Sequence, residues 1–214
     1  MTDTKVDCEM TDTNVDTEIS DTKVDTEISD TKIDCEKTNI NISEIPNIIL
    51  IGDIIPKQTK SKAKWKLNYT CEKNIQIKEN GRIYLIVIDD EIYKIGSSEC
   101  KGGIKNTFNF YEGGLGGSPS LRTFGIHLLI QEHLELGKTI KIYALFVEPI
   151  KVIIRGLYSS IEKITYPQIK EMEDACREDY KKIYGKYPHW NFQENVKEWP
   201  QHIKSAYKEQ VNNR

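Results

Sequence analysis

Residues 81–96 read GRIYLIVIDDEIYKIG, and this stretch decides the fold. Two runs rich in β-branched and aromatic residues, Arg82 to Ile88 and Ile92 to Ile95, flank the acidic break at residues 89–91. Apolar runs of this composition on either side of a short polar break are typical of a β-hairpin. We therefore expect two antiparallel strands joined by a tight turn.

A tyrosine and a lysine stand out within this apolar hairpin. If the loop is the three residues 89–91, Tyr84 pairs with Gly96, and Lys94 lies on the face of Tyr84, one diagonal step away. A two-residue loop predicts opposite faces, because side chains alternate along a strand. A phenol and an amine that share one apolar face suggest chemistry, whereas the competing reading is that Tyr84 is core and Lys94 reaches from a buried strand to water.

The sequences GRIY at 81–84 and YKIG at 93–96 resemble the core of the GIY-YIG nuclease superfamily. They are most similar to the branch that carries lysine in place of the second tyrosine, and they depart from the family name at Arg82 and Lys94. The resemblance covers roughly residues 81–193. It implies an α+β fold with a small three-stranded antiparallel sheet flanked by helices, and hydrolysis of a DNA phosphodiester with one divalent cation, Mg²⁺ or Mn²⁺.

The resemblance assigns catalytic roles to three residues around the hairpin. Tyr84 would take the proton of the attacking water, and the nearby Lys94 ammonium would favour the phenolate. Arg122 would bind phosphate through its planar fork. It lies in the first turn of a helix that we expect to begin at Ser118 and Pro119, an N-cap residue and a good first-turn residue.

A second predicted helix, after Pro167, supplies the metal ligand. Met172 and Cys176 belong to its apolar stripe, and Glu173 flanks that stripe. The resemblance implies that Glu173 holds the cation, with Glu171 as the fallback. It also implies that Asn191 buttresses the site.

Beyond the hairpin, the expected fold contains a third core strand at 140–148 and an added β-hairpin at 150–166. Between the first hairpin and the helix at Arg122, residues 97–118 are rich in glycine and predict a mobile, substrate-facing loop. They lack the Gly-Lys-Ser/Thr ending of a nucleotide-binding P-loop. Phe108, Phe110 and Tyr111 in this segment suit base contacts or a core equally.

The charge of the chain is unevenly distributed between residues 1–45 and the rest of the sequence. Residues 1–45 contain 13 of the 33 acidic residues and 4 of the 30 basic residues. Their net charge is therefore −9, and that of the remaining residues is +6. A basic domain suggests a polyanionic partner, DNA, or simply a solvated surface. We expect Lys64, Lys101 and Lys105 to contact nucleic acid, although a lysine-rich run around Lys64 is often only a solvated linker.

The predicted domain organisation follows from composition. Residues 3–38 hold four nine-residue repeats that begin DTK or DTN, and such acidic units cannot bury a core, so residues 1–45 are expected to be a disordered tail. Residues 46–80 are expected to form a basic linker or arm, 81–193 the nuclease-like domain, and 194–214 a polar C-terminal tail.

Five cysteines without metal-ligand spacing, no signal peptide and no long apolar run predict a reduced, intracellular protein of the cytoplasm or nucleus, without a membrane partner. Two alternatives to a nuclease stay open. One is an inactive nucleic-acid-binding protein on the same scaffold, and the other is a protein-interaction module that acts through the acidic repeats. Oligomeric state is not predicted.

Overall fold

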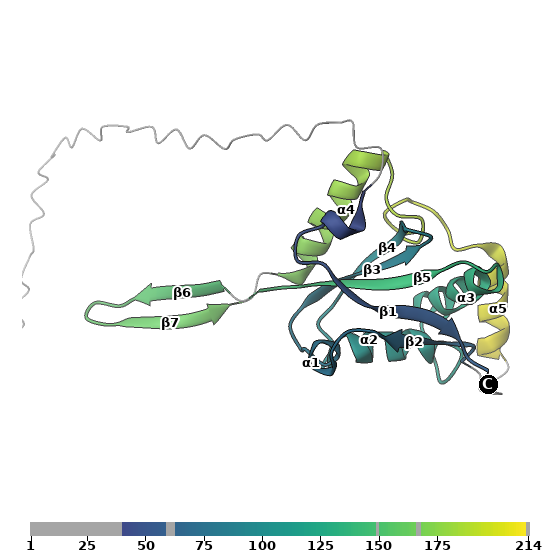
Figure 1. Ribbon diagram of the computed structural model, residues 1–214, viewed down its shortest axis with the longest axis horizontal. Helices are drawn as coiled ribbons and strands as arrows, with labels where there is room; N and C mark the ends of the chain where they lie inside the picture. The colour runs from purple at the N-terminus through teal and green to yellow at the C-terminus, as the bar shows by residue number, and fades with distance from the viewer. Residues whose placement is uncertain (1–39, 59–62, 149, 166–167, 213–214) are drawn as a thin grey trace, which may run out of the picture. The chain divides into compact units, whose positions relative to one another are not determined.

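The computed structural model describes residues 40–58, 63–148, 150–165 and 168–212 (Figure 1). The acidic repeats lie outside these residues. In chain order the elements are η1 (Ile42–Glu44), β1 (Ile49–Pro56), β2 (Trp65–Tyr69), α1 (Lys73–Gln76), β3 (Arg82–Ile88), β4 (Glu91–Ser98), α2 (Gly103–Glu112), α3 (Leu121–Glu135), β5 (Ile140–Phe146), β6 (Ile150–Arg155), β7 (Ser160–Thr165), α4 (Ile169–Tyr184) and α5 (Gln201–Asn212).

The α+β class is confirmed, and the central sheet has five antiparallel strands in the order β2-β1-β5-β3-β4. The three expected core strands are β3, β4 and β5. Segment 46–80, expected to be a linker or arm, instead adds β1 and β2. The reason is an apolar alternation that the lysines conceal, because Trp65 and Leu67 are buried while Lys66 and Asn68 are exposed.

Helices cover both faces of the sheet, so the inner strand β3, which lies between β5 and β4, is buried at all seven positions. Tyr84, Ile86 and Ile88 face the core beneath α2, α3 and α5, whereas Ile83 and Leu85 face the core beneath α4 and η1. A strand covered on both faces reads as a continuous apolar run, which explains why residues 83–88 show no polar alternation.

The hairpin between β3 and β4 differs from the predicted three-residue loop. Ile88 pairs with Glu91 across a two-residue turn of Asp89 and Asp90, whose φ angles of 47° and 65° lie in the left-handed region that aspartate tolerates. The register then shifts at Tyr93, which is the extra residue of a β-bulge. The two turn residues and the bulge residue together have the same effect as a three-residue loop. Tyr84 still pairs with Gly96, and Lys94 lies on the same face as Tyr84.

The glycine-rich segment 97–118 is not all loop, since it contains α2. Ile104, Thr107, Phe108 and Tyr111 recur at the i, i+3, i+4, i+7 spacing of one helix face, and all four are buried. The glycines on either side of this stripe concealed it from the sequence prediction.

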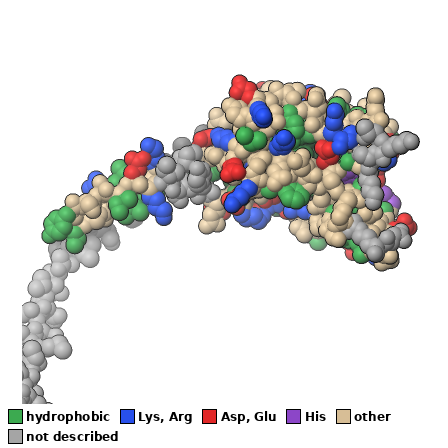
Figure 2. Space-filling model, turned by 90° about the horizontal axis from the view of Figure 1, so that it is seen from below, with side chains coloured by type: hydrophobic (Ala, Val, Ile, Leu, Met, Phe, Trp, Pro, Cys, Tyr) green, Lys and Arg blue, Asp and Glu red, His purple; other side chains and the backbone are tan. Residues whose placement is uncertain are grey.

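Two segments at the periphery differ in whether their hydrophobic side chains are buried. In the β6–β7 hairpin, the described side chains are exposed, and Figure 2 shows hydrophobic groups on its surface. By contrast, the expected polar tail 194–214 contains α5, which packs on α3 through the fully buried Ile203.

Candidate active site

Tyr84 lies at the floor of the predicted site, and Gly96 makes its position possible. A Cβ at Gly96 would lie 2.5 Å from Cζ and from the hydroxyl of Tyr84, so only glycine lets the ring cross its strand neighbour. The ring packs edge-on against Phe108 and Tyr111. The Tyr84 and Tyr111 hydroxyls are 2.6 Å apart and share a hydrogen bond.

The expectation that Lys94 makes Tyr84 acidic is wrong. Burial, followed by the charge and hydrogen bond of Tyr111, raises the pKa of Tyr84 well above its ordinary value. The opposing influence comes from Arg122, the second residue of α3, whose guanidinium lies beside the phenol. Near neutral pH, Tyr84 is therefore a hydroxyl donor and acceptor, and not a phenolate.

Lys94 is the residue whose protonation is poised near neutrality. It pairs with Ile86 and so lies on the same face of the hairpin as Tyr84, with only 4% of its surface exposed. Burial and then the positive charge of Arg122 lower the pKa of Lys94 from 10.5 to about 7, although Glu173 opposes this shift. Among the described residues, no carboxylate is within ion-pair distance of its amine. Lys94 can therefore accept a proton at physiological pH.

Glu173 turns inward from α4 and is held at both carboxylate oxygens. Its Oε2 accepts a hydrogen bond from the Ser97 hydroxyl at 2.5 Å, and its Oε1 lies 3.4 Å from the Arg177 guanidinium. Glu173 is 7% exposed, whereas Glu171 is exposed to solvent. Of the two glutamates considered from the sequence, Glu173 is the one that belongs to the cleft.

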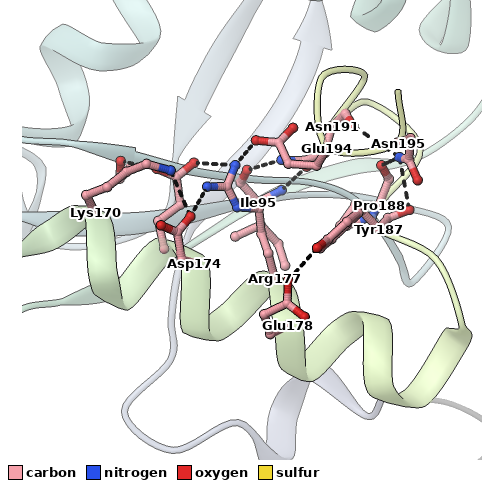
Figure 3. Close-up of polar contacts among 12 residues, drawn as sticks. Ile95, Lys170, Asp174, Arg177, Glu178, Tyr187, Pro188, Asn191, Glu194 and Asn195 are labelled. Atoms are coloured by element: carbon pink, nitrogen blue, oxygen red, sulfur yellow. Dashed lines mark hydrogen bonds and ion pairs between the residues drawn. The ribbon is translucent and has the colours of Figure 1, made fainter. Parts of the chain in front are cut away.

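Arg177 is a site residue that sequence reasoning missed. It is buried beneath Glu173, and its guanidinium also contacts Asp174 on α4 and Glu194 in the following loop (Figure 3). The signal was the i, i+4 spacing of Glu173 and Arg177, which continues to the buried Tyr180. Arg177 thus orients the carboxylate of Glu173 and ties the loop to the helix.

Asn191 acts on the outer edge of β4. Its side chain accepts a hydrogen bond from the Ile95 backbone N–H and donates one to the Ile95 carbonyl, both at 3.0 Å. The neighbouring Trp190 N–H donates to the Tyr93 carbonyl at 2.8 Å. These bonds satisfy the open edge of β4 on either side of Lys94, so Asn191 positions the strand that carries the lysine.

Arg82, where the sequence departs from the family pattern, has a structural role. Its fully buried guanidinium donates to the backbone carbonyls of Lys78, Ser98 and Cys100. Three acceptors compensate for the burial of one cation. Arg82 thereby fixes the end of β4 that carries Ser97.

Two adjoining hollows bring the predicted residues together. A cleft of about 290 Å³ contains Lys94, Arg122, Glu173 and Asn191, and a second hollow of about 280 Å³ contains Tyr84. Arg122 lines both and links them. The basic side chains of the cleft are Lys94, Arg122, Lys170 and Arg177, against the acidic Glu173 and Glu194. This excess of positive charge suits an anion such as phosphate.

The side chains of the cleft are compatible with a divalent cation that binds through a single carboxylate. In the described part of the chain, no group of three or more His, Cys, Asp or Glu side chains could enclose a metal. Mg²⁺ does not need one, because it commonly binds through one or two carboxylates with waters and substrate phosphates. Each Glu173 oxygen has a recorded partner and, with two lone pairs, room for another.

The predicted nucleic-acid contacts lie on the surface but outside both hollows. Lys64 is exposed just before β2, Lys101 is exposed in the turn before α2, and Lys105 is exposed in the first turn of α2. None of the three lines either hollow. Their role in binding nucleic acid stays a prediction.

The residues that the structure describes contain no helix of sufficient length and hydropathy to span a bilayer.

Comparisons with known proteins return similarity in structure alone. No family model matches the sequence, and no curated protein matches it. One similar solved structure is the restriction endonuclease HPY188I in complex with product DNA, at 23% identity and a TM-score of 0.39 over 70% of this chain and 84% of that chain. Another is bacteriophage T4 EndoII in a mutant form, at 16% identity and a TM-score of 0.39 over 67% of this chain and 90% of that chain. Both neighbours are nucleases by name.

Proposed function

We propose that the protein is a metal-dependent DNA endonuclease that hydrolyses phosphodiester bonds. The observation that carries the proposal is the position of Arg122 between the hollow of Tyr84 and the cleft of Lys94 and Glu173. An arginine fork in that place can hold a phosphate between a hydroxyl pair, a proton acceptor and a carboxylate. These are the groups that phosphodiester hydrolysis requires.

The proposed roles follow from the protonation states. Arg122 binds the phosphate, and the Tyr84–Tyr111 hydroxyl pair orients the attacking water. Lys94, neutral above a pH of about 7, accepts the proton of that water. Water attack forms one P–O bond and breaks the bond to the 3′ oxygen, which takes a proton from solvent. The sequence assigned the base to Tyr84, and the altered pKa values favour Lys94.

Glu173 would hold the cation, and Arg177 and Ser97 keep its carboxylate oriented towards the cleft. When bound, Mg²⁺ or Mn²⁺ polarises the phosphoryl group and stabilises the leaving oxygen. The Arg177 guanidinium also makes the potential at Glu173 less negative, so we expect the Glu173 carboxylate to hold a cation only weakly in the absence of DNA.

The test is to incubate the full-length protein with supercoiled plasmid in Mg²⁺ and in EDTA. We expect nicked and linear products in Mg²⁺ and intact plasmid in EDTA. Glu173→Gln should reduce cleavage at least about 100-fold while DNA binding survives, because the carboxylate charge acts on the cation and not on DNA. Glu171→Gln is the matched control, and it should cleave at the wild-type rate.

Retention of plasmid in a gel-shift assay without metal-dependent nicking would favour an inactive DNA-binding protein on this scaffold. Equal loss of cleavage in both glutamine variants would contradict the assignment of Glu173 as the metal ligand.

A further inference from the structure

The hollow of Tyr84 carries an aromatic side chain that the proposed chemistry does not use. Phe110 lies on α2 at the rim of this hollow and is 61% exposed. Its sequence neighbours Phe108 and Tyr111 are buried in the core. Phe110 lies to one side of the stripe they form, because it is out of phase with the residues at 104, 107, 108 and 111.

The position of this ring relative to Arg122 suggests what it contacts. Phe110, Tyr84, Arg122 and Thr123 line the same open hollow of about 280 Å³. If Arg122 holds the phosphate at the cut, a base of an adjoining nucleotide that leaves the duplex stack can enter the same hollow. Proteins that bind unpaired nucleotides combine a positively charged groove with aromatic side chains on which the bases stack, and Phe110 beside Arg122 has this combination.

The polar groups of the hollow favour stacking on the flat face of a base over hydrogen bonding to its edge. The Ser97 hydroxyl donates to Glu173, and the Ser98 and Thr107 hydroxyls pair with each other at 2.8 Å. Thr123 pairs with Ser120, the N-cap of α3. These hydroxyls already have partners, whereas the Phe110 ring is 61% exposed and offers its face to a nucleobase.

We propose that Phe110 forms a stacking subsite for a nucleobase that flanks the phosphate held by Arg122. This inference rests on the proposed function for its ligand, and it adds a contact that tolerates every base, because each base has a π-face. The subsite places the nucleotide next to the cut without reading its sequence.

The test uses an oligonucleotide duplex in which thymines are replaced by 5-iodouracil, a base that cross-links to a stacked aromatic ring on irradiation. The full-length protein is bound to this duplex in EDTA, irradiated and digested, and the modified peptide is identified by mass spectrometry. We expect the cross-link at Phe110, and its absence in Phe110→Ala. Phe110→Ala should also weaken duplex binding about 10-fold, and Phe110→Trp should restore it.

Leu136→Ala is the matched control. Leu136 is exposed at the opposite end of α3 from Arg122, about 20 Å away along the helix. This variant should bind and cross-link as the wild type does.

Plasmid cleavage in Mg²⁺, measured in parallel, separates the two proposals. Cleavage by the wild type, with cross-linking and affinity unchanged in Phe110→Ala, would overturn the subsite and leave the nuclease proposal standing. A Phe110-dependent cross-link without cleavage would support the subsite and contradict the nuclease. Absence of any duplex binding would overturn both.

Discussion

The buried amine of Lys94 should make the stability of the protein depend on pH. Its pKa falls from 10.5 to about 7 because of burial and then Arg122, so between these values the unfolded chain binds a proton that the folded chain does not. The free energy of unfolding should therefore rise with pH across this window, by up to about 1.4 kcal/mol per pH unit. Below a pH of about 7 both states are protonated and this dependence ends.

Lys94→Met isolates this contribution, because methionine keeps most of the apolar stem and removes the titrating group. Urea unfolding of both proteins at several pH values gives the slope of the free energy of unfolding against pH for each protein. The wild type should gain stability relative to Lys94→Met as pH rises above about 7. Parallel curves for the two proteins would show that Lys94 keeps its ordinary pKa.

Among the elements, β4 carries both Lys94 and the glycine that accommodates Tyr84, so the site depends on its integrity. Its residue Gly96 lies beneath the Tyr84 ring, so Gly96→Ala would push a methyl group into the phenol. We expect a loss of about 1–3 kcal/mol in stability, as for other overpacked cores, and a displaced Tyr84 hydroxyl. Chemical denaturation measures the first effect, and loss of plasmid cleavage reports the second.

The same substitution in an open turn provides the comparison for Gly96→Ala. At Gly116, a Cβ would come no closer than 3.4 Å to a neighbouring atom, and its φ is not positive. Gly116→Ala should leave stability within about 0.5 kcal/mol of wild type. If both variants unfold at the wild-type denaturant concentration, Tyr84 does not lie over Gly96.

The elements also show what local sequence can and cannot predict. The apolar runs predicted β3, β4 and β5, and the N-terminal signals predicted α3, although they placed its cap at Ser118 and the structure places it at Ser120. The bulge at Tyr93 was not predictable from the local sequence, since the Tyr93 carbonyl is bonded by the N–H of Trp190, which lies far along the chain. The pKa of Tyr84 and the role of Arg177 were missed for the same reason, since both depend on burial created by distant elements.

At the scale of the whole molecule, the distribution of charge predicts how the N-terminal repeats affect DNA binding. Of the 33 acidic and 30 basic residues, 12 and 4 lie in residues 1–38, so removing them changes the net charge from −3 to +5. This cut leaves the Ile40 N–H bond to Tyr184 and the buried Ile42 in place. We expect the truncated protein to bind DNA more tightly at low salt, because repulsion between the repeats and phosphate is gone.

Salt separates this electrostatic effect from a structural one. Screening weakens interactions between exposed charges, so the advantage of the truncated protein should shrink as ionic strength rises to about 0.15 M and above. Fluorescence anisotropy with a labelled duplex at several salt concentrations measures it. A control chain with Asn and Gln in place of the 12 Asp and Glu in residues 3–38 keeps the four lysines of this segment, so its net charge rises from −3 to +9. It should bind DNA at least as tightly as the truncated protein, because the acidic charges that repel phosphate are gone. If the neutralised control instead binds as weakly as wild type, the repeats hinder DNA by their bulk and not by their charge.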